Sequence, residues 1–313
     1  MKAIVLERPG GVGNFSIEDI PMPELRGEEV LVKVKAISIN PVDYKVRSIE
    51  AALKGIYGDY PRIILGWDIA GEVIETGEGV TSLKKGDRVF GMVNFPGKGD
   101  AYAEYVAAPA DQLAVIPETI SFEAAAATTL AALTALQVLA GRVQAGDRVL
   151  IHAGSGGVGH FAIQIAKSLG AYVITTSSAK NKDFVLALGA DEHIDYRAQA
   201  FEEVVSDVDF VFDMFNGEIL YKSLQVAKVG GTVFSIPTAD FSEAAVALAQ
   251  ERQLDLSFHM VQSSGQNMNQ LSTMLAKGEL QPHISRIFPF EEMGLAHQQQ
   301  ESGRTVGKII VRL

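Results

Sequence analysis

The 313-residue sequence contains no cysteine, and this absence excludes whole classes of site. Without cysteine the chain forms no disulfide bond and offers no thiolate ligand to a metal ion. The six histidines, at positions 152, 160, 193, 259, 283 and 297, lack the paired spacing that holds a metal. The sequence therefore predicts no metal site.

Long apolar runs and a surplus of basic residues are missing too. No stretch approaches the ~18 apolar residues that cross a bilayer. The apolar stretch before Glu7 is too short for the core of a signal peptide. The formal net charge of −11 disfavours nucleic acid and anionic membranes as partners, because both bind basic patches. We expect a cytoplasmic protein with neither kind of partner.

The local sequence pattern divides the chain into two parts. Residues 1–122 are dense in strand and turn signals, such as the alternating segment 29–38, EVLVKVKAIS. The alanine- and leucine-rich segment 121–141 predicts one helix, with Ser121 as its N-cap and Gly141 at its C-terminal end. Beyond it strands and helices alternate, which is typical of a parallel sheet covered on both faces.

The sequence of the C-terminal segment 306–313, VGKIIVRL, predicts a strand like those of the β-rich residues 1–122. We therefore expect the chain to return and complete the domain with which it began. The predicted boundaries are 1–122 together with 263–313 for the β-rich domain, and 123–262 for the α/β domain.

A glycine-rich loop follows the apolar segment 148–153 and leads into an amphipathic helix. Its sequence, GSGGVG, satisfies G-x-G-x-x-G in the strand–loop–helix context that dinucleotide binding requires. A P-loop does not fit, because GSGGVGH lacks the G-K-[ST] ending. The alternative is a tight turn without a ligand. The residues predicted to hold a pyrophosphate are Gly154, Ser155, Gly156, Gly157, Val158 and Gly159.

The following segment, 173–183, bears on which dinucleotide binds. NAD sites usually carry Asp or Glu about 20 residues past the glycines, but this chain reads VITTSSAKNKD. Hydroxyl donors and cations suit the 2′-phosphate of NADPH, which a carboxylate would repel. The alternative for the two lysines is that they only solvate the start of a helix. The predicted 2′-phosphate residues are Thr176, Ser177, Ser178, Lys180 and Lys182.

Several motifs together resemble the medium-chain dehydrogenase/reductase superfamily, and most closely its zinc-free quinone oxidoreductase branch. They are ISINPVDYKVR (37–47), LGWDIAGEV (65–73), KKGDRVFG (84–91), AYAEYV (101–106), AATTLAALTALQ (126–137), AGDRVLIHAGSGGVG (145–159) and LGADEHIDY (188–196). The resemblance implies a doubly wound Rossmann domain with a parallel sheet and a β-rich, GroES-like catalytic domain. It also implies a homodimer paired near an edge strand, GTVFSI (231–236).

The sequence departs from the zinc-dependent members of this superfamily. They carry a catalytic Cys near the position of Ser38, and Gly-His-Glu where this chain has Gly66, Trp67 and Asp68. Without a Lewis acid, oxidation of an unactivated alcohol lacks its usual stabilisation. We expect NADPH to reduce a quinone or an α,β-unsaturated carbonyl compound by hydride transfer. The alternatives are an enoyl-thioester reductase of the same branch and a low-turnover NADPH-binding stress or structural protein.

The resemblance also suggests which residues face the nicotinamide. It implies that Asn40, Asp43 and Tyr44 line the cleft with Lys45 beside them, where Tyr44 or Lys45 can polarise the acceptor oxygen. The alternative for Asp43 is a cap on the following helix.

Further candidates come from other parts of the chain. The resemblance implies that Thr134 contacts the nicotinamide amide. Trp67 is a candidate for the active site, with core packing as its alternative. Asn94, Phe95 and Tyr102 fall in a predicted substrate-loop region, whose segment 94–100 has the composition of a mobile loop.

Overall fold

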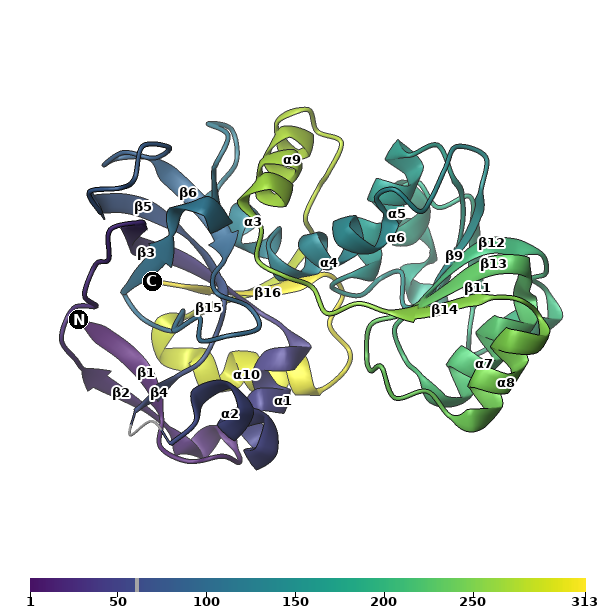
Figure 1. Ribbon diagram of the computed structural model, residues 1–313, viewed down its shortest axis with the longest axis horizontal. Coiled ribbons are helices and arrows are strands. Elements are labelled where there is room, and N and C mark those ends of the chain that lie inside the picture. The colour runs from purple at the N-terminus through teal and green to yellow at the C-terminus, as the bar shows by residue number, and fades with distance from the viewer. Residues whose placement is uncertain (60–61) are drawn as a thin grey trace. The chain divides into compact units, whose positions relative to one another are not determined.

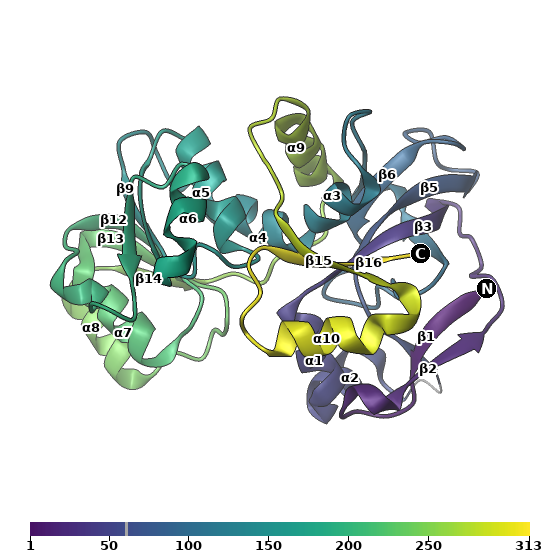
Figure 2. The ribbon, with the colours of Figure 1, turned by 180° about the vertical axis from the view of Figure 1, so that it is seen from behind.

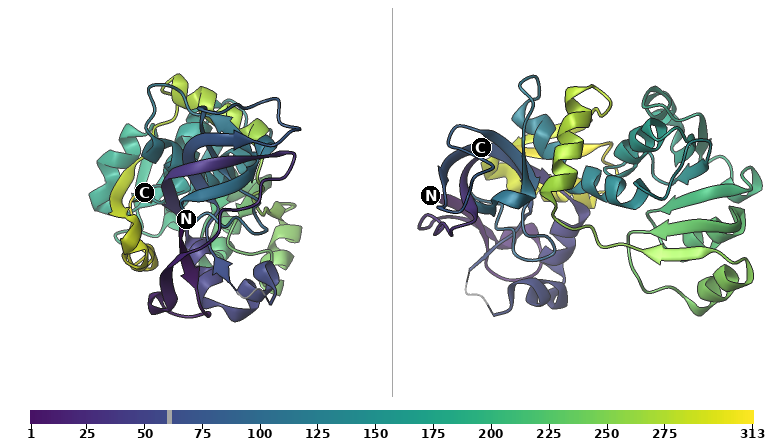
Figure 3. Two further views of the ribbon diagram at one scale, coloured as in Figure 1. Left: turned by 90° about the vertical axis from the view of Figure 1, so that its left-hand side faces the viewer. Right: turned by 45° about the horizontal axis from the view of Figure 1, so that its top comes forward.

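The computed structural model describes residues 1–59 and 62–313, which form two compact units. The first comprises Met1–Leu133 and Val261–Leu313, and the second Thr134–Met260. Both chain ends belong to the first unit (Figure 3). Among the described residues, none of the helices has the length and apolar character to traverse a membrane.

The first unit is built on two sheets (Figure 1). The larger has the strand order β15-β16-β3-β5-β6-β8, with β7 also paired to β3, and the smaller has the order β2-β1-β4. The strands are β1 (Lys2–Leu6), β2 (Phe15–Asp19), β3 (Glu29–Ile39), β4 (Ile63–Ile64), β5 (Asp68–Thr76), β6 (Arg88–Met92), β7 (Tyr105–Pro109), β8 (Leu113–Val115), β15 (Ile284–Pro289) and β16 (Lys308–Arg312).

The helices of this unit surround these sheets. In two opposite views α1 and α10 lie side by side (Figures 1 and 2), and their residues are in contact. The helices are α1 (Pro41–Ser48), α2 (Glu50–Tyr57), α3 (Phe122–Ala127), α9 (Gly265–Ala276) and α10 (Met293–Glu301), with 3-10 turns at Val12–Asn14, Ala110–Gln112 and Phe290–Glu292. A further helix, α4 (Leu130–Leu139), begins in the first unit and continues into the second.

Strand β3 is the centre of the large sheet. Its predicted alternation is present: Val30, Val32, Val34 and Ala36 are buried and Lys33 is exposed. From Ala36 onward every residue is buried, because β5 and β16 both pair with this part of the strand. The antiparallel pairing of Ile309 with Ile39 places the C-terminal strand beside the end of β3.

The second unit contains the expected doubly wound sheet. All neighbouring strands are parallel, in the order β11-β10-β9-β12-β13-β14, with α5 and α6 on one side and α7 and α8 on the other (Figure 1). The elements are β9 (Arg148–Ile151), α5 (Gly159–Ser168), β10 (Tyr172–Ser177), α6 (Lys182–Ala187), β11 (Glu192–Asp195), β12 (Val208–Asp213), α7 (Gly217–Val226), β13 (Ala227–Ser235), α8 (Glu243–Glu251) and β14 (Asp255–Phe258), with 3-10 turns at Ala179–Asn181 and Phe201–Glu203.

This strand order creates a switch point at β9. The chain runs from β9 to β10 and β11 on one side, and then crosses to β12 on the other. Ligands of doubly wound sheets bind outside the carboxyl ends of the strands at such a point, and the glycine loop begins there. The segment 231–236, expected at the sheet edge, lies inside it, because β14 pairs with β13 and forms the edge.

The helix expected over 121–141 is in fact two helices. The predicted N-cap is confirmed, since Ser121 Oγ accepts a hydrogen bond from the amide of Ala124 at 3.1 Å. The helix then breaks at Thr128 and Thr129, and the amide of Leu130 donates to Asp68 Oδ1 at 3.1 Å. The carboxylate of Asp68, in β5, therefore caps the N-terminus of α4. Because α3 packs on β3, β5 and β16, residues 123–133 group with the first unit, whereas the predicted domain boundary lies at 122.

Two glycines of the first unit provide a stability test. A Cβ on Gly71 in β5 would lie 2.3 Å from the carbonyl oxygen of Lys33 in β3, whereas a Cβ on Gly55 in α2 would meet no atom within 4 Å. We expect Gly71→Ala to lower the melting temperature by about 3 to 10 °C, because overpacking costs about 1–3 kcal/mol. The matched change Gly55→Ala should raise it slightly, because alanine favours a helix interior. Calorimetry checks both, and equal shifts of one sign would contradict the assigned packing.

Candidate functional site

The glycine loop joins β9 to α5 with very close backbone contacts. A Cβ on Gly159 would lie 2.2 Å from the carbonyl oxygen of Ala153 and 2.7 Å from Gly154 Cα. A Cβ on Gly154 would lie 2.0 Å from Thr175 Oγ1 in the neighbouring strand. The first and third glycines of the motif therefore allow the helix to approach the sheet. The residue with positive φ in this turn is Ala153, at 51°.

The loop presents free backbone donors at the start of α5. The amide of Gly154 donates to Thr176 O in β10, and that of Gly156 donates to Ala153 O beside the loop. Among the described residues, the amides of Gly157, Val158 and Gly159 have no hydrogen-bond partner. Three consecutive free N–H groups at a helix N-terminus favour a phosphate, through hydrogen bonding and the positive end of the helix dipole. This geometry fits the pyrophosphate of a dinucleotide.

The predicted 2′-phosphate residues fall into two groups. Thr176 and Ser177 are buried, and their hydroxyl groups already contact His152 and His193 at 3.1 and 2.9 Å. The hydroxyl of Ser178 makes no hydrogen bond within the described part of the chain, and Lys180 and Lys182 are exposed without an ion pair there. The two exposed lysines can therefore reach a ligand, whereas Thr176 and Ser177 support the loop from inside. Ser178 is also buried, at 6% exposed, and differs from these two residues only in its unpaired hydroxyl.

His152, which the sequence analysis did not select, holds the loop against α7. Ser223 Oγ donates to the carbonyl oxygen of Ile219, so it accepts the hydrogen bond from His152 Nε2 at 2.9 Å. His152 Nδ1 then accepts from the hydroxyl of Thr176. Burial lowers the pKa of His152 to about 4, which keeps the imidazole neutral in this arrangement. The one signal in the sequence is a histidine inside an apolar strand directly before the glycines.

A second hydrogen-bonded link, made by an asparagine, ties the glycine loop to the segment after β10. Asn181 Nδ2 donates to Ser155 Oγ at 2.9 Å. The pyrophosphate loop and the 2′-phosphate candidates are therefore parts of one hydrogen-bonded structure. Thr134 is buried in α4, and its contact with a nicotinamide stays a prediction.

In the first unit, Asn40 and Asp43 form the N-terminal cap of α1. Asp43 Oδ2 accepts the Asn40 amide at 2.5 Å. The Asn40 side chain donates to Asp68 Oδ2 at 2.8 Å and accepts from Lys308 Nζ. Asn40 is 1% exposed and Asp43 and Asp68 are fully buried. The polar groups of Asn40 and Asp43 are therefore engaged inside the protein, which favours the capping alternative for Asp43, and their contact with a substrate stays a prediction.

The buried charges of this cluster adjust one another's ionisation. Burial raises the pKa of Asp43 to about 7 and also raises that of Asp68, while Lys308 counteracts both shifts. Burial lowers the pKa of Lys308, and the two carboxyl groups oppose that change. Lys308 also donates to the carbonyl oxygen of Ile39 at 3.0 Å. A lysine among apolar strand residues is the sign in the sequence that Lys308 belongs to this cluster, which the sequence analysis did not select.

Trp67 is a core residue and holds the 94–100 loop. It is 0% exposed, its indole N–H donates to the carbonyl oxygen of Gly97 at 2.6 Å, and its ring meets Phe95 edge-on at 5.2 Å. This burial favours the core-packing alternative for Trp67, and a role in the active site stays a prediction.

Other contacts tie down the same loop. Gln112 Oε1 accepts from the amide of Asn94 at 2.6 Å, and Ser263 Oγ accepts from that of Phe95 at 2.9 Å. Tyr102 is fully buried, and its hydroxyl contacts His297 at 2.9 Å. The composition of this segment suggested a mobile loop, but these contacts attach it to the body of the first unit.

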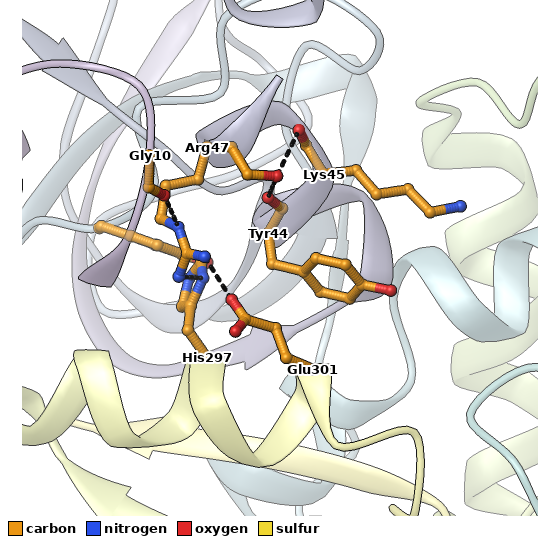
Figure 4. Close-up of polar contacts among 8 residues, drawn as sticks. Gly10, Tyr44, Lys45, Arg47, His297 and Glu301 are labelled. Atoms are coloured by element: carbon orange, nitrogen blue, oxygen red, sulfur yellow. Dashed lines mark hydrogen bonds and ion pairs between the residues drawn. The ribbon is translucent and has the colours of Figure 1, made fainter. Parts of the chain in front are cut away.

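Tyr44 and Lys45 remain the candidates with access to a ligand. Tyr44 is half-buried and Lys45 is exposed. Figure 4 shows both side chains extending away from the cluster of Arg47, His297 and Glu301. Ser48 Oγ donates to the backbone carbonyl oxygens of Tyr44 and Lys45, at 2.7 and 3.3 Å. This contact involves neither the phenol of Tyr44 nor the ammonium group of Lys45.

Comparison with known proteins assigns the family. Residues 26–118 match the profile described as an alcohol dehydrogenase GroES-like domain, and residues 188–311 match the one described as a zinc-binding dehydrogenase. An NADPH-dependent alkenal/one oxidoreductase of Arabidopsis thaliana is 33% identical, over 99% of this chain and 79% of its own length.

Comparison with solved structures supports the same family. The quinone oxidoreductase of Coxiella burnetii is 37% identical with a TM-score of 0.93, covering 100% of this chain and 99% of its own. The Escherichia coli quinone oxidoreductase complexed with NADPH is 26% identical with a TM-score of 0.89, covering 100% of both chains. The two-unit fold and the glycine loop together define the class of nicotinamide-dependent oxidoreductases. This chain belongs to the medium-chain dehydrogenase/reductase superfamily, in its quinone oxidoreductase branch.

The positions of the zinc ligands in related enzymes carry side chains that do not fit a metal. Ser38 and Trp67 are buried, and Asp68 directs both oxygens to hydrogen bonds from Leu130 and Asn40. Within residues 1–59 and 62–313, no group of three or more His, Cys, Asp or Glu side chains is placed to hold a metal ion.

Gly159 tests the glycine loop. We expect Gly159→Ala to weaken nicotinamide cofactor binding at least about tenfold, because the new methyl group would push α5 and its free amides away from Ala153. A fluorescence titration with the reduced cofactor measures the change, and circular dichroism verifies the fold. Unchanged affinity in the folded variant would show that these amides do not hold the cofactor.

Proposed function

We propose that the protein is an NADPH-dependent reductase of quinones or α,β-unsaturated carbonyl compounds that works without zinc. When bound, NADPH supplies the hydride. The second unit binds the cofactor, and the first unit supplies polar groups for the acceptor. A related plant enzyme and related bacterial proteins carry the same activities in their names.

The end of β10 carries the proposal for NADPH. The strand ends at Ser177, and the next residues offer the unpaired hydroxyl of Ser178 and the exposed ammonium groups of Lys180 and Lys182. An NAD site places a carboxylate here to accept from the ribose 2′-hydroxyl. A 2′-phosphate instead requires donors and positive charge. The side chains therefore favour NADPH over NADH.

For the acceptor, Tyr44 and Lys45 are the proposed contacts. Reduction of a quinone or an enone places negative charge on an oxygen of the acceptor. A phenol or an ammonium group that donates to this oxygen stabilises the charge as it develops. Asn40 and Asp43 act indirectly, because they cap the helix on which Tyr44 and Lys45 stand. A cytoplasmic location and a homodimer remain predictions.

The activity is directly testable. We expect the protein to oxidise NADPH in the presence of quinones or enals, followed as the loss of nicotinamide absorbance, and a chelator to leave the rate unchanged. Turnover with enoyl thioesters alone would favour the enoyl-thioester reductase. Tight NADPH binding without turnover on any acceptor would favour the low-turnover binding protein. Activity lost to a chelator and restored by zinc would contradict the metal-free proposal.

The cofactor preference has its own test. Lys180→Ala should raise the Kd for NADPH about tenfold and leave that for NADH nearly unchanged, because only NADPH carries the 2′-phosphate. Lys228→Ala is the matched control, since Lys228 is an exposed lysine of the same unit that pairs with Asp209 at 2.9 Å. Titrations with both cofactors measure the constants. Equal losses of both cofactors in Lys180→Ala would remove the assignment of the 2′-phosphate.

A further inference from the structure

Ala153, the residue directly before the glycine loop, has a backbone conformation that few residues other than glycine adopt. Its φ is 51°, in the left-handed region, where a Cβ crowds the backbone. Its carbonyl oxygen accepts the amide of Gly156 at 2.8 Å, so the turn into the loop begins at this residue. A strained residue persists only where its surroundings hold it. The contacts around Ala153 are therefore part of how the loop is built.

Thr176 of β10 binds the backbone on both sides of Ala153. Its Oγ1 accepts the Ala153 amide at 3.3 Å, and its carbonyl oxygen accepts the Gly154 amide at 3.0 Å. Because these two amides belong to the peptide units before and after Ala153, the two bonds together restrict its φ and ψ. The free amides of residues 157–159 lie on the loop that starts here, so their position depends on Ala153.

The hydroxyl of Thr176 is oriented by His152. A hydroxyl has one hydrogen, and Thr176 directs it to His152 Nδ1 at 3.1 Å, which leaves its oxygen to accept from Ala153. Ser223 Oγ gives its own hydrogen to the carbonyl oxygen of Ile219 at 2.8 Å. His152 Nε2 therefore carries the ring hydrogen and donates it to Ser223 at 2.9 Å. These hydrogen bonds require a neutral imidazole in a single tautomer.

The surroundings of His152 keep the ring in this state. The ring is 1% exposed and meets Phe201 edge-on at 4.7 Å and Phe215 at 6.4 Å. Burial lowers the pKa of His152 to about 4, and Glu202, which pairs with Lys222 at 2.9 Å, opposes this shift. The imidazole is therefore neutral at neutral pH, and its plane is fixed by the two phenyl rings.

We propose that Ser223, His152 and Thr176 form a hydrogen-bonded relay that holds Ala153 in its left-handed conformation and so positions the free amides of the glycine loop for the pyrophosphate. They are positioning residues of the cofactor site. The inference deepens the proposed function and rests on it, because it assigns Thr176 to the pyrophosphate loop instead of the 2′-phosphate. Since NADH and NADPH share the pyrophosphate, the relay serves both cofactors equally.

The first experiment removes the hydroxyl of Thr176 and keeps its shape. Thr176→Val should raise the Kd for NADPH and for NADH by the same factor, about tenfold, because the bond to Ala153 is lost. Thr176→Ser keeps the hydroxyl and should restore both constants. Thr175→Val is the matched control, since the hydroxyl of Thr175 is equally buried in β10 but donates to the carbonyl oxygen of Ile151 at 2.7 Å. It should leave both constants nearly unchanged.

Three results of these titrations would overturn the relay. They are unchanged affinities in a folded Thr176→Val, equal losses in Thr175→Val and Thr176→Val, and a loss confined to NADPH. The last result would return Thr176 to the 2′-phosphate. Circular dichroism verifies that each variant is folded.

A second background tests whether the hydroxyl acts through Ala153. Glycine adopts the left-handed conformation without steric cost, so Ala153→Gly should need the relay less. Thr176→Val should then raise both constants at most about threefold in Ala153→Gly, against about tenfold in the wild-type background. Equal factors in the two backgrounds would show that Thr176 does not hold Ala153.

The ring of His152 gives a measurement on the wild-type protein, which stays decisive if the variants do not fold. Nitrogen NMR at pH 7 should show a neutral ring with its proton on Nε2, and a proton on Nδ1 would overturn the direction of the relay. His152→Gln retains one donor and one acceptor and should bind both cofactors more tightly than His152→Leu, which retains neither. Equal affinities of the two variants would contradict the relay.

The titrations also separate the relay from the proposed function. If the wild-type protein binds both cofactors and reduces no acceptor, the proposed reductase fails and the comparison of Thr176→Val with Thr175→Val still decides the relay. If the wild-type protein reduces an acceptor with NADPH and Thr176→Val binds both cofactors as well as the wild type does, only the relay fails. If the wild type binds neither cofactor, both proposals fail.

Discussion

The buried contact of Lys308 with Asn40 is the interaction on which the first unit depends. It joins the last strand of the chain to the end of β3 across 268 positions of sequence. A buried ammonium group is costly unless it is paired and hydrogen-bonded. Here Asn40 and the carbonyl of Ile39 accept its hydrogen bonds, and two carboxyl groups balance its charge. The same asparagine then caps α1.

The second unit depends on a different constraint, the close approach of α5 to the sheet. Only glycine at 154 and 159 leaves room for it, because any Cβ there would overlap neighbouring atoms. The approach leaves three consecutive amides of the loop free at the start of α5. His152 and Asn181 then fix the loop from both sides. The backbone amides proposed to bind phosphate are thus positioned by packing, and the side chains around the loop act mainly by holding its backbone.

The sequence allowed prediction of what depends on local pattern. The alternation of β3, the Ser121 cap and the strand–loop–helix context of the glycines are all present in the structure. Contacts between distant segments could not be predicted this way. The break in the helix at Thr128 depends on Asp68, sixty-two positions from Leu130. The burial of Asn40 likewise depends on Lys308, and nothing near Asn40 in the sequence announces it.

Positions that bind a catalytic metal in some relatives serve the fold in this chain. In zinc-dependent relatives, the superfamily places metal ligands where this chain has Ser38, Trp67 and Asp68. Here Asp68 starts a helix and binds Asn40, while Trp67 fastens a loop through Gly97. The Asp68 oxygens and the Trp67 indole N–H are engaged in holding the fold, whereas the buried Ser38 Oγ has no hydrogen-bond partner among the described residues. Restoring a ligand at position 67 or 68 alone would therefore break a structural contact before it created a metal site, since an unpaired buried polar group costs about 1–3 kcal/mol.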